Sequence, residues 1–153
     1  MASAIQETAP DLDNDHSFGD QWYWESVSSS NEALGVVEFV IDRMARESYP
    51  DADLFAVRVG LQEAILNAVA HGNRNDPTRL VRVSYHVDAG RVVITVEDEG
   101  EGFDPGRLPD PLAQENLERL HGRGLLLMRS FLTSVRHNER GNRVTLCKER
   151  SRA

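Results

Sequence analysis

The segment from Leu54 to Asn73 constrains the fold more than any other part of this chain, because it carries two stripes of different chemistry. Its apolar residues recur at intervals of three and four, which is typical of a helix that packs one face on a sheet. These residues are Leu54, Val57, Leu61, Ala64, Ile65 and Ala68. The segment predicts one long helix that ends near Gly72, since glycine commonly follows the last helical turn.

The second stripe of this predicted helix is polar and consists of Glu63, Asn67 and His71, each four residues after the last. A carboxylate, a carboxamide and an imidazole are costly to bury unless each has a partner. They therefore predict the wall of a binding or catalytic site. The alternative is the solvated face of an ordinary amphipathic helix, which is the commoner explanation when a helix is considered alone.

Composition and charge narrow the class of protein. With 153 residues, 40% hydrophobic and 27% charged, the chain suits one globular domain. A formal net charge of −8 disfavours nucleic acid as a partner. Cys147 is the only cysteine, so an intrachain disulfide is excluded. No apolar run is long enough to cross a bilayer and no secretion signal is evident, so we expect a cytoplasmic protein without a membrane partner.

The domain boundaries follow from a change in composition near residue 20. Residues 1–19 are polar and acidic without periodicity, which predicts a flexible tail. Residues 20–150 form the predicted folded domain. It begins with a strand over 21–28 that places Trp22 and Trp24 on one face, where they contact either the core or a second subunit.

The remaining elements alternate in type along the chain. Ser29 and Glu32 have the spacing of a capping box, and a helix follows over 31–46, with an apolar run that includes Leu34. Tyr49-Pro50 ends it. The other predicted elements are strands over 80–87 and 91–96, a short helix over 125–132, and strands over 133–138 and 142–148. This order indicates an α+β fold, a two-layer sandwich with a mostly antiparallel mixed sheet and its helices on one face.

A glycine-rich acidic loop follows the strand over 91–96 and contains Asp98, Gly100, Gly102 and Phe103. Glycines two residues apart allow the backbone to approach a ligand closely. The Asp98 carboxylate can accept a hydrogen bond from an exocyclic amino group such as that of adenine. The alternative for this loop is a solvated acidic turn.

A second glycine-containing loop, Gly122-Arg123-Gly124-Leu125, opens into an apolar helix. Backbone N–H groups at such a helix start suit a phosphate, and Arg119 and Arg123 can add charged contacts. A plain loop is the alternative explanation. The segment matches neither the dinucleotide fingerprint nor the P-loop pattern, which disfavours those folds.

The three segments together, in this order, resemble the N box and the two glycine boxes of the GHKL (Bergerat-fold) ATPases, which have a histidine-kinase-like ATPase fold. Their motifs are Glu63-x-x-x-Asn67-x-x-x-His71, Asp98-x-Gly100-x-Gly102-Phe103 and Gly122-Arg123-Gly124-Leu125. Within that superfamily, residues 67–73 and 141–146 resemble bacterial anti-sigma-factor serine/threonine kinases. The resemblance covers approximately residues 22–148.

The resemblance implies a role for each matching position. Asn67 would hold Mg²⁺ through its carbonyl oxygen, and Glu63 would be the general base that activates a serine hydroxyl. Asp98 would contact adenine, and Gly100 and Gly102 would let the nucleotide approach.

The resemblance implies further nucleotide contacts from His71, Asn73, Phe103, Arg119, Gly122, Arg123, Gly124 and Leu125. The segment around Gly122 to Gly124 would form a lid over the phosphates. Helix capping explains His71 and Asn73 equally well, and the spacing does not decide whether Arg119 or Arg123 contacts the γ-phosphate.

The function that the resemblance implies is an ATP- and Mg²⁺-dependent protein serine/threonine kinase. It would bind a sigma factor in one state and phosphorylate a STAS-type antagonist protein in another, and it would form a homodimer. The alternative is a nucleotide-gated protein-binding module that transfers no phosphoryl group.

Overall fold

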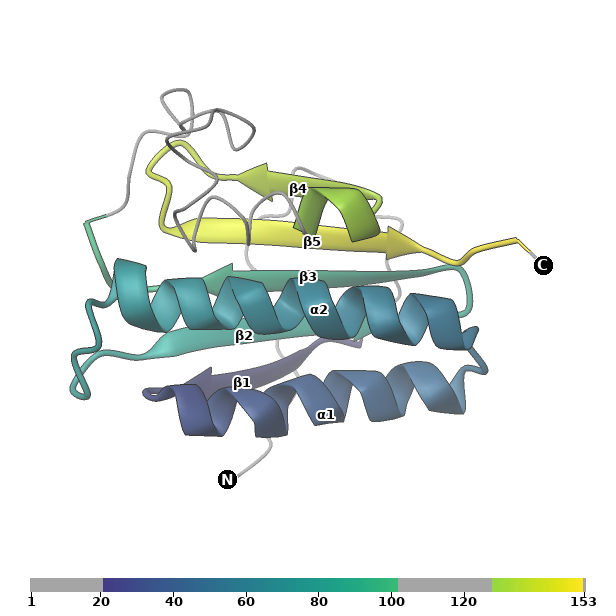
Figure 1. Ribbon diagram of the computed structural model, residues 1–153, viewed down its shortest axis with the longest axis horizontal. Helices are drawn as coiled ribbons and strands as arrows, with labels where there is room; N and C mark the ends of the chain where they lie inside the picture. The colour runs from purple at the N-terminus through teal and green to yellow at the C-terminus, as the bar shows by residue number, and fades with distance from the viewer. Residues whose placement is uncertain (1–20, 102–127, 153) are drawn as a thin grey trace.

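The computed structural model describes residues 21–101 and 128–152, in which five strands form one sheet in the order β1-β2-β3-β5-β4 (Figure 1). All four neighbouring pairs are antiparallel, so the described sheet is antiparallel rather than mixed. The strands are β1 (Tyr23–Val27), β2 (Val81–Val87), β3 (Arg91–Glu97), β4 (Ser134–His137) and β5 (Arg143–Glu149). The predicted tail over 1–19 lies outside the described residues.

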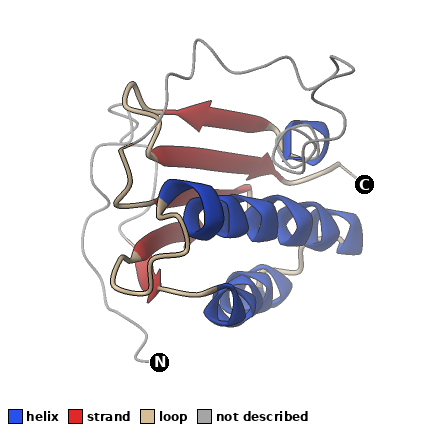
Figure 2. Cartoon of the chain, turned by 60° about the vertical axis from the view of Figure 1, so that its left-hand side comes forward, coloured by secondary structure: helices blue, strands red, loops and turns tan. Residues whose placement is uncertain are grey.

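Two helices, α1 (Ser30–Arg46) and α2 (Asp51–Asn67), lie side by side on one face of this sheet (Figure 2). Side chains alternate between the two faces of a strand, so every second residue of β2 and β3 points to the helices. The core between the layers includes Val83, Tyr85, Ile94 and Val96 from the strands and Val40, Met44, Leu61 and Ile65 from the helices. The predicted α+β two-layer sandwich is confirmed.

The start of α1 differs from the predicted capping box. The Glu32 carboxylate accepts hydrogen bonds from the Ser28 backbone N–H at 3.4 Å and from the Ser29 hydroxyl at 3.3 Å. The Ser29 hydroxyl is therefore directed at Glu32, and it caps no N–H of the helix. Leu34 was predicted in the apolar run but is 56% exposed, and Ala33 is buried in its place. Both errors concern the first turn, where periodicity is least informative.

Trp22 is buried on the sheet face that the helices do not cover. Its ring lies 5.7 Å from that of His86, while the neighbouring Tyr85 points into the main core. At the edge of the sheet, Glu25 of β1 is also buried, and its Oε2 has no hydrogen-bond partner within the described residues. Burial raises the pKa of the Glu25 carboxyl. This edge thus holds a carboxyl group directed inward.

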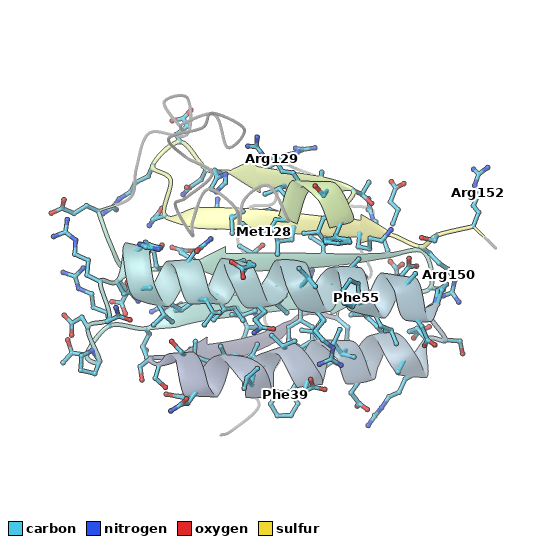
Figure 3. The ribbon with its side chains drawn as sticks, in the orientation of Figure 1. Phe39, Phe55, Met128, Arg129, Arg150 and Arg152 are labelled. Atoms are coloured by element: carbon cyan, nitrogen blue, oxygen red, sulfur yellow. The ribbon has the colours of Figure 1, made fainter. Side chains whose placement is uncertain are left out.

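Residues at the C-terminal end of β5 and directly after it form hydrogen bonds and an ion pair with the start of α2 and the turn before it. The Ser151 backbone N–H and hydroxyl both donate to the Asp53 carboxylate, and Lys148 Nζ lies 3.5 Å from Asp53 Oδ1. Arg150 donates to the backbone carbonyls of Glu47 and Ser48 (Figure 3). These contacts fix the end of α2 that lies farthest from Asn67. No helix within 21–101 or 128–152 has the length and apolar character needed to span a membrane.

Asp53→Asn should lower the free energy of unfolding by about 1–3 kcal/mol at neutral pH, because it weakens two hydrogen bonds and a buried ion pair. Burial alone would raise the pKa of Asp53, but hydrogen bonds from Ser151 and the charge of Lys148 lower it. The stabilisation is therefore present above the unfolded-state pKa and is lost as pH falls through the folded-state pKa. Urea unfolding from pH 3 to 7 measures it.

The matched control is Asp51→Asn, because Asp51 is an exposed carboxylate in the same first turn of α2. This control removes the same charge from the helix start without touching Ser151. Equal stability of the two variants at neutral pH would show that the Asp53 contacts contribute nothing.

Candidate functional site

The helix α2 continues into a wider turn, the π-helix η1 (Ala68–Gly72). The Asn73 backbone N–H donates to the Ala68 carbonyl at 2.8 Å, a spacing of five residues. The α-helix thus passes into a π-turn after Asn67, and the helical segment as a whole ends at Gly72, as predicted. Single π-turns are rare and are frequent at functional sites.

Glu63 and Asn67 are half-buried and lie one turn apart on α2. Within the described residues, neither side chain has a recorded hydrogen bond, so their oxygens can serve a ligand. His71 is exposed and follows in η1, where the wider turn no longer has the α-helical spacing. Of the predicted polar stripe, Glu63 and Asn67 are thus half-buried, whereas His71 is exposed.

The first glycine loop packs directly on η1. A Cβ atom on Gly100 would lie 2.0 Å from the Gly72 carbonyl oxygen, and one on Gly72 would lie 2.2 Å from Asp98 Oδ2. A side chain at Gly100 would therefore force the two backbones apart, whereas one at Gly72 would displace the Asp98 carboxylate. Gly72 was predicted as a helix stop, but positive φ values occur later, at Arg74 and Asn75. Its role in the structure is close approach to Asp98.

The Asp98 carboxylate is half-buried, with two oxygens in different situations. Oδ1 accepts a hydrogen bond from the Gly100 backbone N–H at 2.8 Å. Oδ2 has no recorded partner within the described residues. Burial raises the pKa of Asp98, and the Gly100 hydrogen bond and the charges of Arg140 and Arg79 oppose that shift. Because the Gly100 N–H is bonded to Oδ1, Oδ2 is the oxygen that can accept a hydrogen bond from a ligand.

Asn73 lies inside this arrangement rather than on its surface, with only 2% of its area exposed. Its Nδ2 donates to the Leu80 carbonyl at 3.1 Å, and its Oδ1 accepts from the Glu99 backbone N–H at 2.8 Å. Both polar ends of the side chain thus bind the main chain, so a direct nucleotide contact by Asn73 stays a prediction.

Asn142 is a residue of this site to which the sequence assigned no role. Its carbonyl accepts from the Asp98 backbone N–H at 2.9 Å, and its Nδ2 donates to the Asp98 carbonyl at 3.4 Å. The pairing of Glu97 with Arg143 brings residues 98 and 142 together. The resemblance of residues 141–146 drew attention to this segment, but the contact with Asp98 depends on the pairing of β3 with β5, which the sequence did not provide.

The side chains of this site favour a metal ion that is coordinated mainly by the phosphates of a bound ligand and by water, and only partly by the protein. Among the described residues no cluster of three or more His, Cys, Asp or Glu side chains could hold a metal ion. Mg²⁺ commonly takes one or two protein oxygens and fills its other positions with phosphate and water. The side-chain carbonyl oxygen of Asn67, one helical turn after Glu63 on α2, can supply one of these protein oxygens for Mg²⁺.

A helical turn over 128–131, which begins at Met128, overlaps the predicted helix over 125–132 (Figure 3). Leu132 fills a notch at Gly60, where a Cβ would lie 2.6 Å from Leu132 Cδ1. The remaining predicted site residues lie outside the described residues: Gly102, Phe103, Arg119, Gly122, Arg123, Gly124 and Leu125.

Comparison with known proteins supports the same family. Residues 27–148 match the family described as Histidine kinase-like ATPase domain. The anti-sigma F factor of Geobacillus thermodenitrificans is 33% identical over 114 residues, which cover 72% of this chain and 76% of the relative. That of Oceanobacillus iheyensis is 29% identical over 132 residues, covering 82% and 88% respectively.

A solved structure shares the fold. The structure of the RsbU and RsbW domains of Rv1364c from Mycobacterium tuberculosis matches 85% of this chain with a TM-score of 0.55. The identity is 16% and the match spans 33% of that longer chain, so this likeness concerns the fold alone. The family match and the anti-sigma F factor relatives confirm the resemblance, and the shared fold agrees with it. The chain belongs to the histidine-kinase-like (GHKL) ATPase family, among its anti-sigma regulatory factors.

Proposed function

We propose that this anti-sigma regulatory factor is an ATP- and Mg²⁺-dependent protein serine/threonine kinase whose substrate is a STAS-type antagonist protein. The observation that carries the proposal is the placement of Glu63 and Asn67 one turn apart on α2, half-buried and with oxygens free of recorded hydrogen bonds within the described residues. A carboxylate beside a neutral amide oxygen can take a proton and hold a hard cation, respectively.

In the proposed reaction, a serine hydroxyl oxygen of the antagonist forms a bond to the γ-phosphorus of ATP. The bond from that phosphorus to the β–γ bridging oxygen breaks, and ADP leaves with those electrons. Glu63 accepts the hydroxyl proton and orients the serine. The side-chain carbonyl oxygen of Asn67 would hold Mg²⁺, which would supply positive charge to offset the negative charge of the phosphates.

Nucleotide recognition is proposed for the loop on the other side of η1. Asp98 Oδ2 accepts a hydrogen bond from the exocyclic amino group of adenine. Phosphate and lid contacts remain proposals for residues matched by the resemblance: His71, Gly102, Phe103, Arg119, Gly122, Arg123, Gly124 and Leu125.

The names of the relatives support a proposal about partners. The relatives are called anti-sigma F factors. We propose that this chain binds a sigma factor, acts in the cytoplasm and forms a homodimer.

Mg·ATP binding should depend on both sides of the site. Asp98→Asn replaces one acceptor oxygen by a donor group, so it should weaken binding about tenfold or more. Asn67→Ala should weaken binding mainly when Mg²⁺ is present. Calorimetry with and without Mg²⁺ measures both effects, with Asp51→Asn as the control for loss of an acidic charge. Wild-type affinity in Asp98→Asn would exclude the proposed adenine contact.

Glu63→Ala should lower phosphoryl transfer by about 10²–10⁴-fold, the usual contribution of a general base, and leave ATP affinity nearly unchanged. Labelled phosphate incorporated into a purified STAS-type antagonist measures transfer, and Gln62→Ala, the neighbouring half-buried position, is the control. A wild type that binds ATP and a sigma factor yet transfers nothing would instead support the nucleotide-gated binding module.

A further inference from the structure

We infer that Asn73 and Asn142 are positioning residues that fix the Asp98 carboxylate from two sides and thereby set a preference for adenine over guanine. This inference rests on the proposed nucleotide site. Neither asparagine needs to touch the nucleotide, because each acts through the main chain of the loop that carries Asp98. The contacts that support it come from two turns far apart in the sequence.

The first support comes from the turn that follows α2. Asn73 is buried, and its carboxamide joins two segments, since it accepts from the Glu99 N–H and donates to the Leu80 carbonyl. The Glu99 carboxylate in turn accepts from the Leu80 backbone N–H at 2.6 Å. Glu99, the residue directly after Asp98, is thus held by hydrogen bonds to Asn73 at the end of η1 and to Leu80 just before β2.

The second support comes from the turn between β4 and β5. Asn138 Oδ1 accepts from the backbone N–H groups of Gly141, Asn142 and Arg143, which fixes the shape of that turn. Asn138 Nδ2 donates to Asn142 Oδ1 at 2.8 Å. Since its Oδ1 is an acceptor there, the Asn142 amide presents Nδ2 to the Asp98 carbonyl. The orientation of the Asn142 carboxamide is therefore determined.

As a result, one oxygen of the Asp98 carboxylate, Oδ1, already accepts a hydrogen bond within the protein. With the main chain held before and after it, the Gly100 N–H occupies Oδ1, and η1 lies against the carboxylate at Gly72. Oδ2 is the remaining acceptor. Adenine presents an amino donor at its six position, whereas guanine presents a carbonyl oxygen there. Two acceptors facing each other repel, so a fixed Oδ2 favours adenine.

Loosening the loop should therefore weaken ADP binding and reduce the discrimination against GDP, because a freer carboxylate can turn toward the N–H groups of guanine. We would measure ADP and GDP affinities for wild type, Asn73→Ala, Asn73→Asp and Asn142→Ala. We expect ADP affinity to fall about tenfold in both alanine variants and the ADP-to-GDP affinity ratio to fall about fivefold. Asn31→Ala, an exposed asparagine at the start of α1, is the control.

Asn73→Asp tests the two hydrogen bonds of the Asn73 side chain independently. It keeps an acceptor for the Glu99 N–H and removes the donor to the Leu80 carbonyl. It should retain more selectivity than Asn73→Ala. Amide hydrogen exchange at Glu99 should be about fivefold faster in Asn73→Ala than in wild type. Asn142→Ala leaves the backbone bond to Asp98 in place, so it remains a test of selectivity if Asn73→Ala fails to fold.

The outcomes separate this inference from the function on which it rests. A wild type that binds ADP, with variants that keep its ADP-to-GDP ratio, would overturn the positioning role and leave the nucleotide site standing. A folded wild type that binds neither nucleotide would overturn the nucleotide site, and this inference would fail with it. A lowered ratio in both alanine variants, absent in Asn31→Ala, supports the inference.

Discussion

The contact between Gly72 and Gly100 is the constraint on which the site depends. A Cβ on Gly100 would collide with the Gly72 carbonyl oxygen and one on Gly72 with the Asp98 carboxylate, so the π-turn after α2 and the loop after β3 pack closely against each other. That approach brings the helix bearing Glu63 and Asn67 against the loop bearing Asp98. The site is consequently assembled by backbone packing, and its polar side chains are placed as a result.

Much of this architecture was predictable because periodicity reports burial. The apolar stripe of α2 and the alternation in β2 and β3 determine which faces meet, and both predictions are confirmed. The order of elements also gave the layer arrangement. Glu63, Asn67 and Asp98 could be selected because uncompensated polar groups beside apolar runs are unusual.

The rest depends on information that a single sequence does not carry. The π-turn adds one residue to the last helical turn without a distinct sequence pattern, so the change from α-helix to π-helix after Asn67 was not predicted. Asn73 seemed equally suited to capping or to ligand contact, and only its burial and two bonds show how its amide is used. Asn142 is defined by strand pairing across more than forty positions, which local spacing cannot reveal.

The two edges of the described sheet have a consequence for solubility. An open edge presents unpaired backbone groups that can add a strand from another molecule and start aggregation. β4 has only four residues and carries the exposed Arg136, while β1 directs the buried carboxyl group of Glu25 inward. A foreign strand would find only four residues to pair with at β4, next to the exposed charge of Arg136. These features disfavour indiscriminate strand addition at that edge of the described sheet.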